Sequence, residues 1–302
     1  MTQLQPYWKY LFLLACLLGV VNLCSQQVIP SMPNNGVYRP FPLPQTLTFA
    51  DEPVPLDLPD VAERLDRELQ STAYFHSNTL LALKRLQRHL PELDRLLREN
   101  GMHPDFKYLA LAESLLSNAT SPKGAVGIWQ LMPATAKALK LRINDEVDER
   151  YHFEKSTIAA CKHLKYGYKR FGSWTSAAAS YNRGVGGLEA AFKTQKVDSY
   201  YDLYLNDETS RYLFRILALK EVLENPQRYG FSMMDADAYA TTPTRPLTVT
   251  STIEDLPAFA LEQGTNYKTL RLHNPWLRTY KLTVTDTTTR YTLLIPAKTA
   301  RE

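Results

Sequence analysis

The chain has 302 residues, of which 44% are hydrophobic and 22% are charged, and its formal net charge is +4. That length allows one large domain, or a medium domain with a smaller one, in an ordinary globular composition. The small basic excess contains no long run of lysine or arginine, so it gives no reason to expect a nucleic acid partner, and we expect none.

The first 25 residues differ from the rest of the chain. Lys9 is their only charged side chain, and an unbroken apolar run extends from Tyr10 to Val21. The run is short for a membrane span and has the length of a signal-peptide core. We therefore expect a signal peptide over residues 1–25 and export to the periplasm or cell envelope. Lipid attachment at Cys16 or Cys24, and an uncleaved membrane anchor at the N-terminus, both stay open.

Residues 26–59 are rich in proline, which predicts an extended, poorly packed linker. Beyond the signal peptide Cys161 is the only cysteine, so no intramolecular disulfide is available. Its helical surroundings predict a small core residue rather than a nucleophile.

Residues 60–235 show helical periodicity almost throughout and no strand-like alternation, which predicts a mainly α domain. The expected helices are Asp60–Leu69, Asn78–Glu99, Asp105–Ser117, Ala134–Ala138, Lys155–Phe171, Thr175–Asn182, Gly187–Thr194 and Asp207–Glu224.

The pattern changes near the C-terminus. Residues 236–246 are predicted to be a linker, and residues 247–298 a small βααβ module. Its expected elements are strands over Leu247–Thr252 and Arg290–Pro296 and helices over Asp255–Gln263 and Tyr267–Asn274.

Glu113 stands out because it is the only acidic or basic side chain between Lys107 and Lys123. A carboxyl group alone on an apolar helix face is costly to ionise, so its pKa rises. A glutamic acid that keeps its proton near neutral pH suits general acid catalysis, although most glutamates in helices are surface or ion-paired residues.

Two further segments carry polar groups beside small residues. After the helix of Glu113 comes a loop, NATSPKGAVG, and then IWQLMP, in which Trp129 and Met132 are candidates for sugar-face packing or simply for the core. Later, Tyr181 and Asn182 end an alanine-rich helix before a glycine-rich turn. No strand precedes that turn, so a nucleotide loop is not expected.

Taken together, Glu113-Ser114, Ser121–Ala125, Gly127–Pro133 and Ser180–Gly184 resemble the lytic transglycosylase (SLT) domain of the goose-lysozyme-like superfamily. The resemblance covers residues 75–231 and is greatest to the D-type branch of the membrane-bound lytic murein transglycosylases. It implies a lysozyme-like fold and a peptidoglycan substrate. It also implies that Glu113 is the catalytic acid and base, and that substrate-binding residues are Ser114, Ser121, Gln130, Met132, Tyr181, Asn182 and Tyr212.

The same resemblance implies a mechanism with a single carboxylate. Ordinary glycosidases use two, and no second carboxylate lies near Glu113 in the sequence. The N-acetyl group of the muramic acid would stabilise the developing charge, and the C6 hydroxyl would close a 1,6-anhydro ring. Two alternatives stay open: a hydrolytic muramidase using Asp207 or Glu208, and a non-catalytic peptidoglycan-binding protein.

The C-terminal unit resembles a LysM module, a fold that binds glycans containing N-acetylglucosamine. The residues that carry this similarity are Leu247–Val249, Tyr267–Leu270, Asn274–Trp276 and Leu294–Pro296. Glycan binding and a purely structural role as a cap are both open. The six histidines lack the spacing of metal ligands, so we expect neither metal nor cofactor.

Overall fold

The computed structural model describes residues 38–286 and 288–297. The signal peptide expected over residues 1–25 lies outside the described residues, as does the expected linker up to residue 37. The chain is divided at Arg39, and the architecture below is that of the unit that begins at Pro40. None of the helices in the described ranges combines the length and hydropathy that crossing a bilayer requires.

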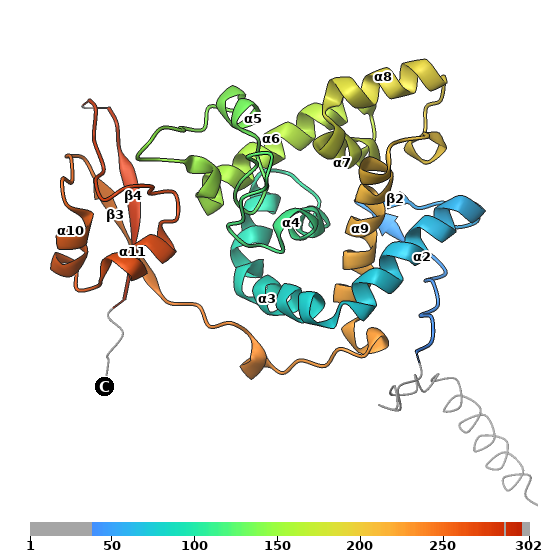
Figure 1. Ribbon diagram of the computed structural model, residues 1–302, viewed down its shortest axis with the longest axis horizontal. Coiled ribbons are helices and arrows are strands. Elements are labelled where there is room, and N and C mark those ends of the chain that lie inside the picture. Colours follow the sequence, from blue (N-terminus) through green and yellow to red (C-terminus); the bar gives the residue numbers. More distant parts are fainter. Residues whose placement is uncertain (1–37, 287, 298–302) are drawn as a thin grey trace, which may run out of the picture. The chain divides into compact units, whose positions relative to one another are not determined.

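All the segments predicted as helices between residues 60 and 224 are helical (Figure 1). Their ends differ from prediction by a few residues, as is usual when periodicity alone sets the boundary. The helices are α2 (Pro59–Tyr74), α3 (His76–Glu99), α4 (Phe106–Ser114), α5 (Pro133–Ala138), α6 (Phe153–Phe171), α7 (Trp174–Arg183), α8 (Val185–Gln195) and α9 (Asp207–Glu224). Short 3-10 helices cover Glu149–Tyr151, Tyr200–Asp202, Pro226–Tyr229 and Asp235–Asp237.

Helix α9 is the centre of this domain. Every residue from Ile216 to Val222 is buried, which is the pattern of a helix enclosed by others rather than lying at a surface. It packs against α2, α4 and α7. Figure 1 shows α4 almost end-on, with α3 and α9 beside it. The packing of α4 on α9 brings the ends that carry Glu113 and Tyr212 together.

The expectation of a poorly packed linker over residues 26–59 does not hold for its described part beyond Pro40. The strands β1 (Thr48–Phe49) and β2 (Glu52–Pro53) form a small hairpin. Phe49 is fully buried in the helical core, and Val54 is 6% exposed. The prolines of this segment cannot donate backbone hydrogen bonds. The segment nevertheless packs on the helices, because burying the apolar side chains between the prolines stabilises the packed arrangement over an extended, solvent-exposed one.

The same segment is tied to the helices by polar contacts. The Glu52 carboxylate accepts hydrogen bonds from the backbone amides of Trp174, at 2.5 Å, and Thr175, at 2.8 Å, and so caps the start of α7. The amide of Ala50 donates to Asp105 at 2.8 Å. These contacts make residues 40–56 part of the helical domain.

The predicted βααβ module is present. Strands β3 (Thr244–Val249) and β4 (Tyr291–Pro296) pair antiparallel, and α10 (Leu256–Glu262) and α11 (Tyr267–His273) lie between them in sequence. The linker expected over residues 236–246 is shorter than predicted, because Thr244, Arg245 and Pro246 already belong to β3. Pro246 is tolerated there because a sheet of two strands consists of edges only.

The module shares its core with the helical domain. Val126, Val147 and Tyr151 of the helical domain belong to the same buried cluster as Trp276 and Leu277. The amide of Asp148 donates to the carbonyl of Trp276 at 2.9 Å. Two further contacts at this junction join Glu146 to Thr283 and stack His152 on Trp276.

Cys161 is 1% exposed, which confirms its predicted place in the core. Burial raises the pKa of its thiol to about 12, so the thiolate that a nucleophile needs is scarce at neutral pH.

Candidate active site

Glu113 lies in the last turn of α4, and the helix ends one residue later. Leu115 and Leu116 both adopt left-handed backbone, with φ of 50° and 54°. That conformation costs a residue with a Cβ about 1–2 kcal/mol, and strain of this kind gathers at functional sites where the surroundings enforce it. Leu116 is buried, and Arg85 donates a hydrogen bond to the carbonyl of Leu115 at 3.3 Å. The helix predicted to run to Ser117 is therefore shorter than periodicity suggested.

The environment of Glu113 favours its protonated form. Loss of solvent raises the pKa of its carboxyl from 4.5 to about 7, and the nearby Glu208 carboxylate adds to the rise. A hydrogen bond from the Tyr212 hydroxyl, at 2.5 Å to Oε1, and the Arg215 cation act in the opposite direction. The raised pKa predicted from the sequence is confirmed. Near neutral pH, Glu113 can both give up and take back a proton.

Two tyrosines accompany Glu113. Burial, and then the charge of Glu113, raise the pKa of Tyr181 and Tyr212 well above the usual value of 10. Both hydroxyls therefore keep their protons and donate hydrogen bonds. Tyr212 donates to Glu113, whereas Tyr181 donates to the backbone carbonyl of Trp129 at 2.7 Å. Tyr212 thus orients the acid, and Tyr181 holds the segment that follows the loop.

Gln130 closes the loop that begins at residue 118. Its backbone is left-handed, with φ of 47°, and its side-chain amide donates to the carbonyls of Ala119 at 3.0 Å and Gly127 at 2.8 Å. A Cβ on Gly127 would lie 2.2 Å from the carbonyl oxygen of Arg150, so only glycine fits there. The Gln130 amino group braces the loop, which leaves the side-chain carbonyl oxygen to meet a ligand.

The two serines predicted to bind substrate differ in whether the hydroxyl proton is already used in a hydrogen bond. Ser114 donates its hydroxyl proton to the carbonyl of Ile128 at 2.8 Å, so it ties α4 to the loop. Ser121 instead accepts a hydrogen bond from the amide of Ala125 at 3.0 Å and keeps a proton to donate. Of the pair, Ser121 is better placed to donate to a ligand.

Met132 and Trp129 differ in their exposure to solvent. Met132 is 42% exposed at the start of α5, where its thioether can contact a ligand. Trp129 is fully buried, and its indole donates to the Thr157 hydroxyl at 2.9 Å. Trp129 is therefore a core residue, and the alternative in which it packs against sugar faces is wrong.

Asn182 connects α7 to the start of α9. Its side-chain oxygen accepts from the Thr209 hydroxyl at 3.0 Å, and its amino group donates to Glu208 at 3.4 Å. Lys123, from the loop after α4, lies 3.8 Å from the same carboxylate. The Glu208 side chain is 61% exposed, so this second carboxylate sits in solvent with a cation beside it.

The sequence did not single out two charged residues near Tyr212, Arg215 and Glu68. Arg215 follows Tyr212 by three residues on α9, a spacing that puts both on neighbouring positions of one helix face. That signal was present in the predicted helix, but nothing singled it out. Glu68, which forms ion pairs with Arg211 and Arg215, comes from α2 and could not be connected to them without the fold.

No metal centre is evident in the part of the chain that the structure describes. It contains no group of three or more histidine, cysteine, aspartate or glutamate side chains that could hold an ion.

Comparisons with known proteins identify two domains. Residues 94–203 match the family model described as "Transglycosylase SLT domain", and residues 245–299 match "Soluble lytic transglycosylase C-terminal LysM-like domain". Two segments of the chain are therefore similar to domains of lytic transglycosylases, the first to an SLT domain and the second to a LysM-like domain. The SLT match contains Glu113, Gln130 and Tyr181 and ends before Tyr212.

The chain is also similar to individual proteins. The chain is 29% identical over 198 residues to "Membrane-bound lytic murein transglycosylase D" of Escherichia coli strain K12, and equally to that of Escherichia coli O6:H1. The match covers 63% of this chain but only 43% of those relatives' length. A solved lytic transglycosylase Slt from Pseudomonas aeruginosa, an inactive mutant, is 21% identical with a TM-score of 0.37, covering 47% of this chain and 24% of that one.

Proposed function

We propose that this protein, with its SLT-like segment over residues 94–203, is a peptidoglycan lytic transglycosylase. It would cleave the β-1,4 bond between N-acetylmuramic acid and N-acetylglucosamine without water and leave a 1,6-anhydromuramic end. The observation that carries the proposal is Glu113, a partly buried carboxyl group with a pKa of about 7 and a tyrosine hydroxyl 2.5 Å away.

The chemistry needs one group that acts first as acid and then as base. Glu113 protonates the glycosidic oxygen as the bond from that oxygen to C1 breaks. The oxygen of the substrate's own acetamido group stabilises the positive charge left at C1. The Glu113 carboxylate then takes the proton of the C6 hydroxyl, whose oxygen bonds to C1. A pKa near 7 suits both steps, because neither proton transfer is strongly uphill.

A water-based mechanism would need a second carboxylate held against the substrate. Among the described residues, Glu208 is the carboxylate whose charge acts on Glu113. It is mostly exposed and is engaged by Asn182 and Lys123. This arrangement supports the single-carboxylate mechanism over hydrolysis.

The remaining site residues divide by role. Tyr212 positions Glu113. Ser121, the Gln130 side-chain oxygen, Met132 and Asn182 offer groups to the sugar and its acetamido substituents. Tyr181 and Ser114 act on the substrate indirectly, since their hydroxyl protons are used on the backbone of residues 128 and 129.

The proposed substrate places the protein in the cell envelope, and the name of the Escherichia coli relatives, a membrane-bound murein transglycosylase, agrees. Export by the N-terminal signal, a periplasmic location and attachment to a membrane are part of the same proposal.

For the LysM-like module we propose the structural role. The module shares a buried core with Val126 and Tyr151, which supports the proposal that it stabilises the loop carrying Ser121 and Gln130.

Mass spectrometry of digested peptidoglycan tests the proposal. We expect anhydromuropeptides from the native protein and none from Glu113→Gln. Reducing-end muropeptides would instead establish a hydrolytic muramidase, and binding without any released product would establish a non-catalytic protein.

A further inference from the structure

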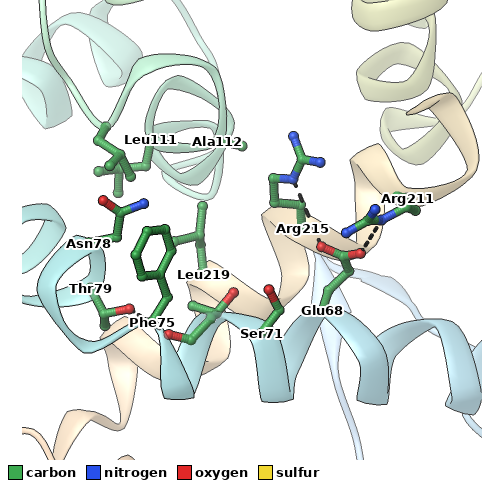
Figure 2. A pocket seen from close by; sticks show the side chains of 12 residues that line it. Glu68, Ser71, Phe75, Asn78, Thr79, Leu111, Ala112, Arg211, Arg215 and Leu219 are labelled. Atoms are coloured by element: carbon green, nitrogen blue, oxygen red, sulfur yellow. Dashed lines mark hydrogen bonds and ion pairs between the residues drawn. The ribbon is translucent and has the colours of Figure 1, made fainter. Parts of the chain in front are cut away.

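A pocket of about 310 Å³ opens where α2, α3, α4 and α9 meet. Figure 2 shows polar side chains around it and an aromatic ring at one side. Its volume far exceeds that of a single carboxylate or acetamido group. Glu68, Arg211 and Arg215 lie together on one side of the pocket, whereas Asn78 lies on the other side, next to the apolar Phe75. Leu219 adds a further apolar surface.

The polar side of the pocket carries an unbalanced positive charge. The Glu68 side chain is 4% exposed, and it lies 2.6 Å from Nε of Arg211 and 3.9 Å from Nε of Arg215. One buried carboxylate therefore serves two guanidinium groups. Arg211 has a second partner, Asp207, at 3.5 Å. Asp207 does not line the pocket, so among the lining residues two guanidinium groups face one carboxylate, and Arg215 makes the longer contact with it.

Within the described part of the chain, Arg215 has fewer ion-pair contacts than Arg211, the other guanidinium in the pocket. The Arg215 side chain is 42% exposed, and it approaches Glu68 only through Nε. In Figure 2 its two terminal amino groups point away from Glu68. A planar pair of donors of this kind matches a carboxylate with two parallel hydrogen bonds.

The pocket adjoins the catalytic acid. Ala112 and Leu115 line it and flank Glu113 in the sequence. Arg215 is close enough for its charge to lower the pKa of Glu113. Glu113 itself is not part of the lining, and Arg215 is the residue that belongs both to the pocket and to the surroundings of the acid.

We infer that the pocket binds the peptide that peptidoglycan carries on the lactyl group of muramic acid, with Arg215 holding a carboxylate of that peptide. The inference rests on the proposed function. Peptidoglycan peptides combine free carboxylates with small alkyl side chains, and the pocket offers a cation beside the apolar surfaces of Phe75 and Leu219. The Phe75 side of the pocket is accessible, since this residue is 56% exposed.

The lactyl group itself becomes a carboxylate when the peptide is removed, so the two sources must be separated. The experiment compares glycan strands with intact peptides and the same strands after an amidase has removed them. Steady-state kcat/KM is measured on both substrates for the native protein, Arg215→Ala and Asn78→Asp. Arg67→Ala, which removes an exposed arginine on α2 outside the pocket, is the matched control.

Because the Arg215 charge also lowers the pKa of Glu113, Arg215→Ala changes the acid on both substrates, and the inference concerns the difference between them. We expect the loss of kcat/KM on peptide-bearing strands to exceed the loss on peptide-free strands about tenfold, equivalent to about 1.4 kcal/mol. Asn78→Asp puts a competing carboxylate in the pocket and should act in the same direction. It keeps the test open if Arg215→Ala unfolds. Arg67→Ala should match the native protein on both substrates.

An equal loss on both substrates would overturn the inference, because Arg215 would then act on the lactyl carboxylate or on Glu113 alone. No loss on either substrate would overturn it as well. Failure of the proposed function has a different signature: the native protein would release no anhydro products from either substrate.

Discussion

Replacing Glu113 with glutamine should make the protein more stable and inactive, with the gain in stability appearing only as pH rises. In the native protein, the pKa of Glu113 rises from 4.5 to about 7 on folding. Between these values the folded state holds a proton that the unfolded state has lost, so stability falls as pH increases. Glutamine cannot ionise and does not incur this loss.

The expected size follows from the two pKa values. At about 1.36 kcal/mol per pKa unit, raising the pKa from 4.5 to about 7 lowers the free energy of unfolding by about 3 kcal/mol above pH 7. Below pH 4.5 the carboxyl is protonated in both states, and the loss vanishes. The Tyr212 hydroxyl can donate to the glutamine oxygen, so the substitution keeps that hydrogen bond.

Urea unfolding followed by circular dichroism at pH 4, 6 and 8 measures the effect. The midpoint for Glu113→Gln should equal that of the native protein at pH 4 and exceed it progressively at pH 6 and 8, with an unchanged slope. Glu63→Gln, which changes an exposed carboxylate on α2, is the control and should stay within about 0.5 kcal/mol at each pH. A gain that is equal at all pH values, or absent at pH 8, would refute the assignment of a raised pKa to Glu113.

Three further substitutions test the site and its supports. Tyr212→Phe removes a hydrogen bond that lowers the pKa of Glu113. The alkaline limb of the plot of kcat/KM against pH should therefore move up by about one pH unit. An unchanged alkaline limb would show that this hydrogen bond does not act on the acid. Gly127→Ala forces a Cβ to within 2.2 Å of the Arg150 carbonyl, and activity should fall at least about tenfold, whereas native activity would mean that the loop can shift freely. Leu277→Ala opens a cavity in the core that the module shares with the helical domain, so calorimetry should show a loss of about 2–4 kcal/mol; a change below about 1 kcal/mol would contradict the shared core.

Much of the helical domain could be predicted because its signal is local. Amphipathic periodicity located each helix from α2 to α9. The helix-terminating sequence Glu99-Asn100-Gly101 predicted the C-terminal end of α3, which ends at Glu99 in the structure. The βααβ order of the module was equally visible. The linker over residues 26–59 was mispredicted beyond Pro40 because composition reports proline content, whereas burial of Phe49 depends on helices far away in the sequence.

The sequence by itself determined that Glu113 is an isolated carboxyl group on an apolar helix, because isolation and periodicity are properties of neighbouring residues. Only the tertiary structure decided what surrounds it. Tyr212 lies 99 residues away in sequence, and its hydrogen bond to Glu113 exists because α4 packs on α9. The buried Glu68 between Arg211 and Arg215 likewise depends on the packing of α2 against α9. Charges interact through space, so the pKa of the acid and the ion-pair contacts of Arg215 follow from packing, which no local pattern encodes.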